Sequence, residues 1–238
     1  MGRAFEFRKA RKMKRWSNMS KTFTRIGREL IISVKESGPD PSSNSRLRAI
    51  IQNAKAANMP KENIERAIKK ASEKSSENFK EILLEGYAPH GIAILVEAAT
   101  DNNNRTVANI RSYFNKCDGS LATSGSVDFL FDHLCFFQIK DEDIDIEELE
   151  LELIDFGVIE LSKSENEISI TARFEDFGSI QKELERRKLE ISSSELEREA
   201  KINKALPQDE RLKVERLINM IDEDEDVQNV YHDMKTND

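Results

Sequence analysis

The sequence predicts an α+β protein of several domains, in which an amino-terminal three-helix domain precedes two ferredoxin-like α/β sandwich domains. Three observations predict this class. The first third of the chain is basic and has the 3.6-residue periodicity of helices, whereas later segments alternate between strand-like and helix-like patterns. Within residues 134–204 the order of elements reads βαββαβ, which is typical of a split βαβ sandwich. This last domain is predicted to be inserted in the middle one.

Residues 1–77 are predicted to form a basic arm and a three-helix domain. In the first helix, apolar residues recur at the spacing of one helix face, at Met19, Phe23, Ile26, Leu30 and Val34. Helix breakers at 37–41 end it, and the capping candidates at 42–44 begin a second helix. Pro60 suits the first position of a third helix, whose last turn carries Lys69 and Lys70.

Residues 78–133 together with 205–238 are predicted to form one discontinuous α/β domain. Residues 81–88 and 91–98 are strand-like, TDNNNRT begins a helix, and SVDFLF is expected to be a strand with Val127, Phe129 and Phe131 on one face. These elements lack a second helix and a fourth strand. The carboxy-terminal segment supplies both, so residues 134–204 are left as the insertion.

The sequence contains no pattern typical of catalysis or of a cofactor site. None of the nine glycines forms a GxG pair, which excludes a dinucleotide fingerprint, and there is no Walker loop. The three histidines lie far apart, and the two cysteines form no CxxC pair that would suggest zinc. The acidic runs 141–145 and 222–226 lack the glycine of a calcium loop. We therefore expect a protein that is not an enzyme and has no cofactor or metal.

The chain has neither a membrane-spanning pattern nor a disulfide framework. No apolar run approaches the roughly 18 residues that a membrane helix needs, so we expect no membrane partner. Two unpaired cysteines suit a reducing compartment, and we predict a cytoplasmic protein. A mitochondrial transit peptide would also be basic, but the basic arm continues directly into the first helix without a serine-rich stretch. The oligomeric state is left open.

Charge is distributed unevenly along the chain. Residues 1–77 hold 19 Lys and Arg against 8 Asp and Glu, whereas the remainder holds 18 basic and 37 acidic residues. A basic segment on an acidic protein indicates contact with a polyanion, although a charged helix face can also be merely solvated. We predict that phosphates are bound by Arg3, Arg8, Lys9, Arg11, Lys12, Lys14, Arg15, Lys21, Arg25, Arg28, Lys61, Arg66, Lys69 and Lys70.

Four stretches resemble the YebC/PmpR family of transcriptional regulators over essentially the full chain: SRLRAIIQNAKAANMPKENIERAIKKA, EGYAPHGIAILVEAATDNNNRTVANIR, GSVDFLF and DVQNVYH. The resemblance implies a helical domain followed by two α/β domains, with the carboxy-terminal segment returning to the middle one. It also implies that Asn58–Lys61 and Arg66 belong to the family's most recognisable helical motif. The chain departs from the family at Ala88–Gly91, where relatives usually have GPGG, and in its opening residues.

Two functions are consistent with these patterns. The first is a DNA-binding transcriptional regulator that uses the basic arm and the helical domain. The alternative is a ribosome-associated translation factor that uses the same cations on ribosomal RNA. Charge serves either polymer, because phosphate contacts position a protein without reading sequence. The expected partner is therefore DNA or ribosomal RNA.

Overall fold

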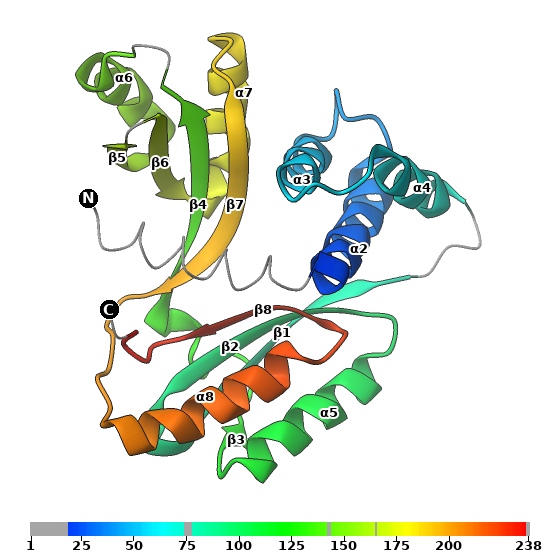
Figure 1. The fold of residues 1–238 in the computed structure, drawn as a ribbon, viewed down its shortest axis with the longest axis vertical. Coiled ribbons are helices and arrows are strands. Elements are labelled where there is room, and N and C mark those ends of the chain that lie inside the picture. Colours follow the sequence, from blue (N-terminus) through cyan, green and yellow to red (C-terminus); the bar gives the residue numbers. More distant parts are fainter. Residues whose placement is uncertain (1–18, 74–77, 142–143, 165, 237–238) are drawn as a thin grey trace. The chain divides into compact units, whose positions relative to one another are not determined.

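The computed structural model of the protein describes residues 19–73, 78–141, 144–164 and 166–236. The chain forms two compact units, one of Met1–Ser76 with His133–Glu197 and one of Glu77–Asp132 with Arg198–Asp238 (Figure 1). Helices precede two four-stranded sheets, so the predicted α+β class is confirmed. The finer division into three domains, with its boundaries at 77, 133 and 204, stays a prediction.

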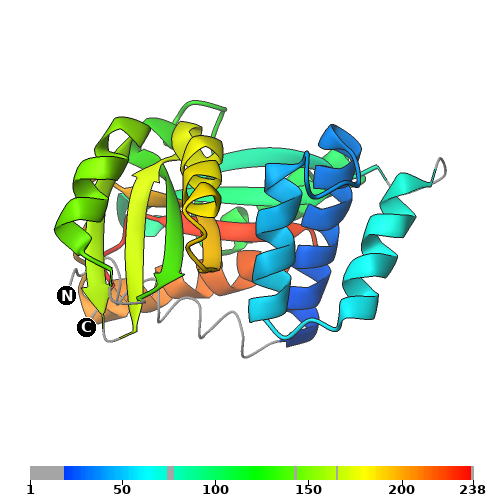
Figure 2. The ribbon, with the colours of Figure 1, turned by 90° about the horizontal axis from the view of Figure 1, so that it is seen from above.

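The first unit begins with three helices: α2 (Met19–Ser37), α3 (Ser45–Ala56) and α4 (Lys61–Ser72). Helix α2 packs against both α3 and α4, and the three stand side by side in Figure 2. Asn44 fixes the first connection. Its Oδ1 accepts the Leu47 N–H at 2.9 Å, and its Nδ2 donates to the carbonyls of Ser33 and Gly38, each at 2.9 Å. One buried amide therefore caps α3 and ties it to the end of α2.

The inserted part of the first unit is a four-stranded sheet with two helices on one face. Its elements are β4 (Phe131–Lys140), α6 (Ile146–Leu153), β5 (Val158–Ser164), β6 (Glu167–Arg173), α7 (Phe177–Arg186) and β7 (Ile191–Ala200). The strand order is β5-β6-β4-β7, which is the split βαβ arrangement. The core contains Phe137, Ile139, Leu153, Ile170 and Ile180, each with no exposed surface.

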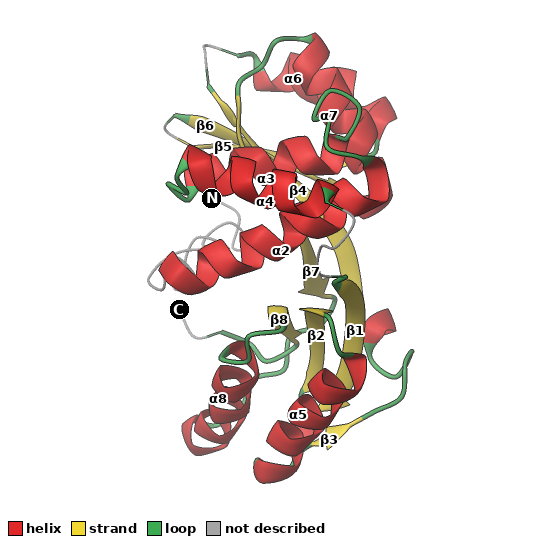
Figure 3. Ribbon diagram, turned by 90° about the vertical axis from the view of Figure 1, so that its right-hand side faces the viewer, coloured by secondary structure: helices red, strands yellow, loops and turns green. Residues whose placement is uncertain are grey.

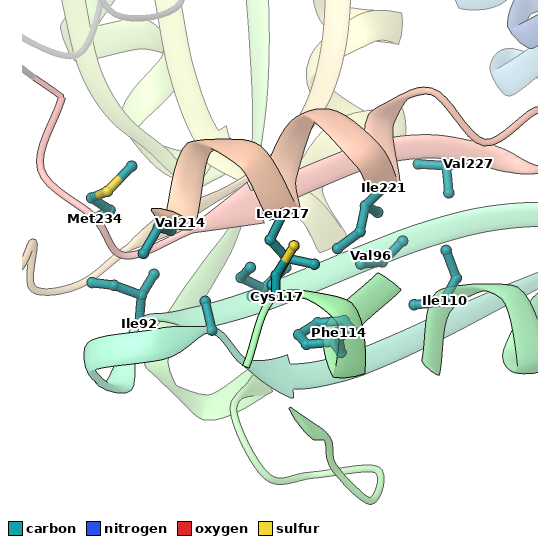
Figure 4. Close-up of a cluster of buried hydrophobic side chains, with 12 residues drawn as sticks. Ile92, Val96, Ile110, Phe114, Cys117, Val214, Leu217, Ile221, Val227 and Met234 are labelled. Atoms are coloured by element: carbon teal, nitrogen blue, oxygen red, sulfur yellow. The ribbon is translucent and has the colours of Figure 1, made fainter. Parts of the chain in front are cut away.

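The second unit is completed by the carboxy-terminal segment. Its elements are β1 (Lys80–Tyr87), β2 (Ala93–Thr100), α5 (Asn103–Lys116), β3 (Ser120–Leu121), α8 (Gln208–Asp222) and β8 (Val227–His232). The order β3-β1-β2-β8 places the last strand beside β2. Helices α5 and α8 pack together on this sheet (Figure 3). Phe114, Leu217 and Ile221 meet in the core between them (Figure 4).

The segment 126–131 differs from the predicted strand. Residues Asp128–Leu130 form a 3-10 turn, and β4 begins only at Phe131. The cause is the buried carboxylate of Glu85, which accepts N–H groups from Gly125 at 2.6 Å, Val127 at 2.7 Å and Asp128 at 3.0 Å. A chain that curls around one carboxylate cannot also form a strand ladder. Phe129 is therefore 63% exposed, whereas Val127 is fully buried.

Candidate nucleic-acid interface

Half of the predicted phosphate contacts lie in the basic arm. These seven residues are outside the residues that the structure describes, and their role stays a prediction: Arg3, Arg8, Lys9, Arg11, Lys12, Lys14 and Arg15.

Helix α2 carries three of the predicted phosphate contacts, Lys21, Arg25 and Arg28, and exposes only two of them. Lys21 and Arg28 are partly exposed, but Arg25 retains only 5% of its surface and so is not on the exposed surface that a phosphate contact requires. The physical reason is that α2 is not buried along a single stripe. Residues 30–34 are all buried, which means that neighbours cover this helix on more than one side.

Helix α4 carries the best exposed set of predicted contacts. Ile64 and Ala71 are buried, whereas its four cations are all exposed: Lys61, Arg66, Lys69 and Lys70. Two acids moderate this face. Glu62 and Glu65 precede Arg66 and Lys69 by four residues, a spacing that supports a helix through side-chain pairing. Glu65 also lies 3.4 Å from Lys61. The face is cationic overall, but not uniformly so.

The turn before α4 has a defined conformation that sets the direction of this helix. Asn58 adopts a left-handed backbone with φ of 58°, and Met59 is 8% exposed. The N–H of Met59 donates to the carbonyl of Ala54 at 2.8 Å, which closes the end of α3. Pro60 lies just before α4 as its capping residue, one position earlier than predicted. The Asn-Met-Pro sequence is thus a helix connector.

Lys55 is an exposed cation that the prediction omitted. It lies in the last turn of α3 and forms no ion pair within the described part of the chain. Arg46 and Arg48, on the same helix, are engaged by Glu36 and Glu185, each at 2.9 Å. Lys55 could have been selected from the sequence, because it lies within the helical motif. Sequence alone, however, does not show which of Arg46, Arg48 and Lys55 forms no ion pair with the described residues.

The TDNNNRT motif forms hydrogen bonds that stabilise the fold and does not form an anion-binding site. Asn102 caps α5 by accepting the Arg105 N–H at 3.1 Å. The Arg105 guanidinium donates to Asp101 at 2.8 Å and to Asp226 at 2.9 Å, and hydrogen bonds to Asp226 and Asp101 raise the pKa of Arg105. Thr106 donates to the same Asp226 oxygen at 2.7 Å. Two carboxylates therefore already neutralise the one cation of this motif.

The described residues offer no candidate metal site, and they contain one thiol with a strongly raised pKa. No cluster of three or more histidine, cysteine or acidic side chains among them has the geometry of a metal site. Burial, with the nearby charge of Asp176, raises the pKa of Cys135 to about 12, so this thiol stays protonated at neutral pH.

Membrane insertion by a helix also finds no support in the described ranges. None of the helices there combines the length and apolar character that crossing a bilayer requires.

Two family models together match most of the chain. The TACO1/YebC amino-terminal domain matches residues 3–74, and the model of the second and third domains of TACO1/YebC matches residues 79–234. The helical domain and both sheets are therefore covered by this family.

Curated relatives and a solved structure agree with these matches. A protein of Flavobacterium johnsoniae is 66% identical over 235 residues, covering 99% of each chain, and one of Myxococcus xanthus is 48% identical, covering 98% of this chain and 100% of its own. Both are named "Probable transcriptional regulatory protein". The crystal structure of a conserved hypothetical protein from Aquifex aeolicus superposes with a TM-score of 0.74 at 35% identity, covering 91% of this chain and 90% of that one. The chain belongs to the TACO1/YebC family.

Proposed function

We propose that this protein is a cytoplasmic, non-enzymatic regulator of gene expression that binds DNA through its basic arm and helical domain. The observation that carries the proposal is the separation of charge, because residues 1–77 have a large excess of cations and the rest of the chain a larger excess of acids. Such a chain attracts a polyanion to its basic segment. The relatives' name, "Probable transcriptional regulatory protein", supports the same proposal.

The exposed face of α4 provides a rigid part of this surface. Four cations on one short helix are held by the buried Ile64 and Ala71 and by the connector before it. Contacts of this kind bind phosphate without selecting a sequence. Arg25 is left out of the surface because it is buried, and Lys55 is added because it is exposed and forms no ion pair with any residue that the structure describes.

The salt dependence of DNA binding tests the proposal. Each phosphate neutralised lowers the slope of log K against log salt by about 0.9. Replacing Lys61, Arg66, Lys69 and Lys70 by Gln should weaken binding to duplex DNA and flatten this slope. The matched control replaces four exposed cations elsewhere, Arg111, Lys182, Lys213 and Arg216, by Gln. Equal losses from both sets would show that only net charge matters and would contradict the proposed surface.

The same proteins distinguish DNA from ribosomal RNA. Full-length chain is compared for retention on duplex DNA and for cosedimentation with ribosomes at physiological salt. We expect the native chain to stay bound to duplex DNA at this salt concentration. The variant with the four α4 cations replaced by Gln should no longer be retained on the DNA. Cosedimentation with ribosomes together with loss of DNA at that salt would replace this proposal by the translation-factor alternative.

A further inference from the structure

A pair of apolar side chains lies on the outer side of α6 in the first unit. Leu151 is 73% exposed, and Ile154, in the 3-10 turn that follows α6, is 60% exposed. Residues three apart on a helix are neighbours, so these two share one surface, while Leu149 and Leu153 are buried in the core. Grouped exposed apolar residues indicate an interaction site.

Acidic side chains surround this patch. Glu147 and Glu150 lie four residues before Leu151 and Ile154, and Asp155 lies four residues after Leu151, so all three border the apolar pair. They are exposed, and none has an ion pair within the described ranges. Like charges three residues apart on a helix repel. A ligand that brings cations would therefore stabilise both the complex and the helix.

This combination restricts what can occupy the patch. Nucleic acid is repelled by the acids, and the same patch on a second copy would oppose like charges. The occupant must combine apolar side chains with cations. Residues 3–15 of this chain have that composition, with seven basic residues and one acid, and with Phe5, Phe7 and Met13 among them.

We propose that the acid-rimmed patch of Glu147, Glu150, Leu151, Ile154 and Asp155 binds the chain's own basic segment, residues 3–15, and thereby withholds it from nucleic acid. The withholding of this segment from nucleic acid rests on the proposed function, whereas its docking on the patch does not. Reach does not limit the contact. Phe7 precedes Met19, the first residue of α2, by twelve positions, and twelve extended residues span about 40 Å, whereas the compact unit that contains both α2 and α6 has an expected radius of gyration of about 14 Å. Docking would suppress weak non-specific binding, because only the released segment is available to phosphate.

A spin label on the segment tests docking without nucleic acid. Cys117 and Cys135 are buried, so Ala10→Cys is expected to provide the single reactive thiol of the full chain. The nitroxide should broaden the amide signals of residues 150–155, and about 1 M NaCl, where the Debye length falls to about 3 Å, should restore them. Sharp signals at low salt would overturn the proposal. Equal broadening in a mixture of spin-labelled chain with separate isotope-labelled chain would assign the segment to a second copy and overturn it as well.

A charge-neutral pair of variants tests the patch itself. Leu151→Ser with Ile154→Ser should abolish the broadening, whereas Ile202→Ser with Leu212→Ser, which also replaces two exposed apolar side chains, should not. If the segment is docked in about two-thirds of molecules, its release raises the affinity for duplex DNA about threefold. Loss of broadening with unchanged affinity would overturn the withholding. Broadening in a chain that binds no DNA would leave docking intact and refute the proposed function alone.

Discussion

Arg105 donates a hydrogen bond of 2.9 Å to Asp226, which lies 121 residues later in the sequence. The same carboxylate oxygen accepts Thr106 at 2.7 Å and Thr100 at 3.3 Å, and Asp226 is only 3% exposed. The pair joins the beginning of α5 to the segment that enters β8. Since residues 133–197, which belong to the first unit, separate these segments in sequence, this contact helps to hold the returning chain in place.

Asp226→Ala should therefore destabilise the second unit. Removing the carboxylate leaves the buried Thr106 hydroxyl without its charged acceptor and should cost about 3 kcal/mol in the free energy of unfolding, measured by urea denaturation. Asp101, the other partner of Arg105, has a half-exposed side chain. Asp101→Ala should therefore change the free energy of unfolding little. Equal effects of the two substitutions would contradict the structural role of the buried partner.

Glu85 should make the stability of the second unit depend on pH. Burial acts to raise the pKa of this carboxyl, but the N–H groups of Val127, Gly125 and Asp128 outweigh it, so the folded-state pKa lies below its usual value. Its contribution is thus fully present well above the unfolded pKa of about 4.3 and is lost as pH falls through that value toward the folded pKa. Glu85→Gln should cost about 2 kcal/mol at pH 7 and little at the acid limit.

Urea unfolding at pH 7, 5, 4 and 3 would check this dependence. The difference between the native chain and the variant should shrink as pH decreases. A constant difference at all four values would show that the charged form of Glu85 does not organise residues 125–128.

Asn53 should control the outer edge of β7. Its Nδ2 donates to the Ser194 carbonyl at 2.5 Å and its Oδ1 accepts the Ser194 N–H at 3.1 Å, so the amide pairs with this edge as a neighbouring strand would. Asn53→Ala leaves both backbone groups unpaired and should cost about 1–3 kcal/mol, with faster amide exchange at Ser194. Hydrogen exchange of the full chain measures this directly.

Gln52 offers the matched control on the same helix. Its buried Oε1 has no hydrogen-bond partner within the described structure, so Gln52→Ala removes no hydrogen bond from that atom. Exchange at Ser194 should remain slow in this variant. If both variants accelerate it equally, helix packing rather than the Asn53 amide protects the edge.

His90 should show the cost of a side chain in the left-handed region. Its φ is 64°, in the turn where family relatives usually have glycine, and its Nδ1 lies 3.4 Å from Glu210. Both His90→Gly and His90→Ala lose the imidazole, but only Ala retains a Cβ. We expect the Gly variant to be more stable than the Ala variant by about 1 kcal/mol in thermal unfolding. At Ala108, exposed in α5, glycine should instead be the less stable residue.

Local structure was largely predictable because it depends on neighbouring residues. Asn44 and Asn102 precede the two helices that they cap, and the apolar spacing of α4 shows its buried face without reference to the rest of the chain. Asn58, in contrast, looks like an ordinary loop residue, although its left-handed backbone is what directs α4. For the candidate interface, the sequence identified cations but could not show that Arg25 is buried and that Lys55 forms no ion pair among the residues 19–73, 78–141, 144–164 and 166–236.

By itself, the sequence determined the α+β class, the order of helices and strands outside residues 120–131, and the uneven distribution of charge that underlies the proposed function. Those properties follow from periodicity, capping and composition, which are local or additive. Only the tertiary structure decided that Glu85 gathers residues 125–128 into a turn and that Asp226 engages Arg105 and Thr106. A buried carboxylate must find hydrogen-bond donors, and which donors reach it depends on how distant segments pack.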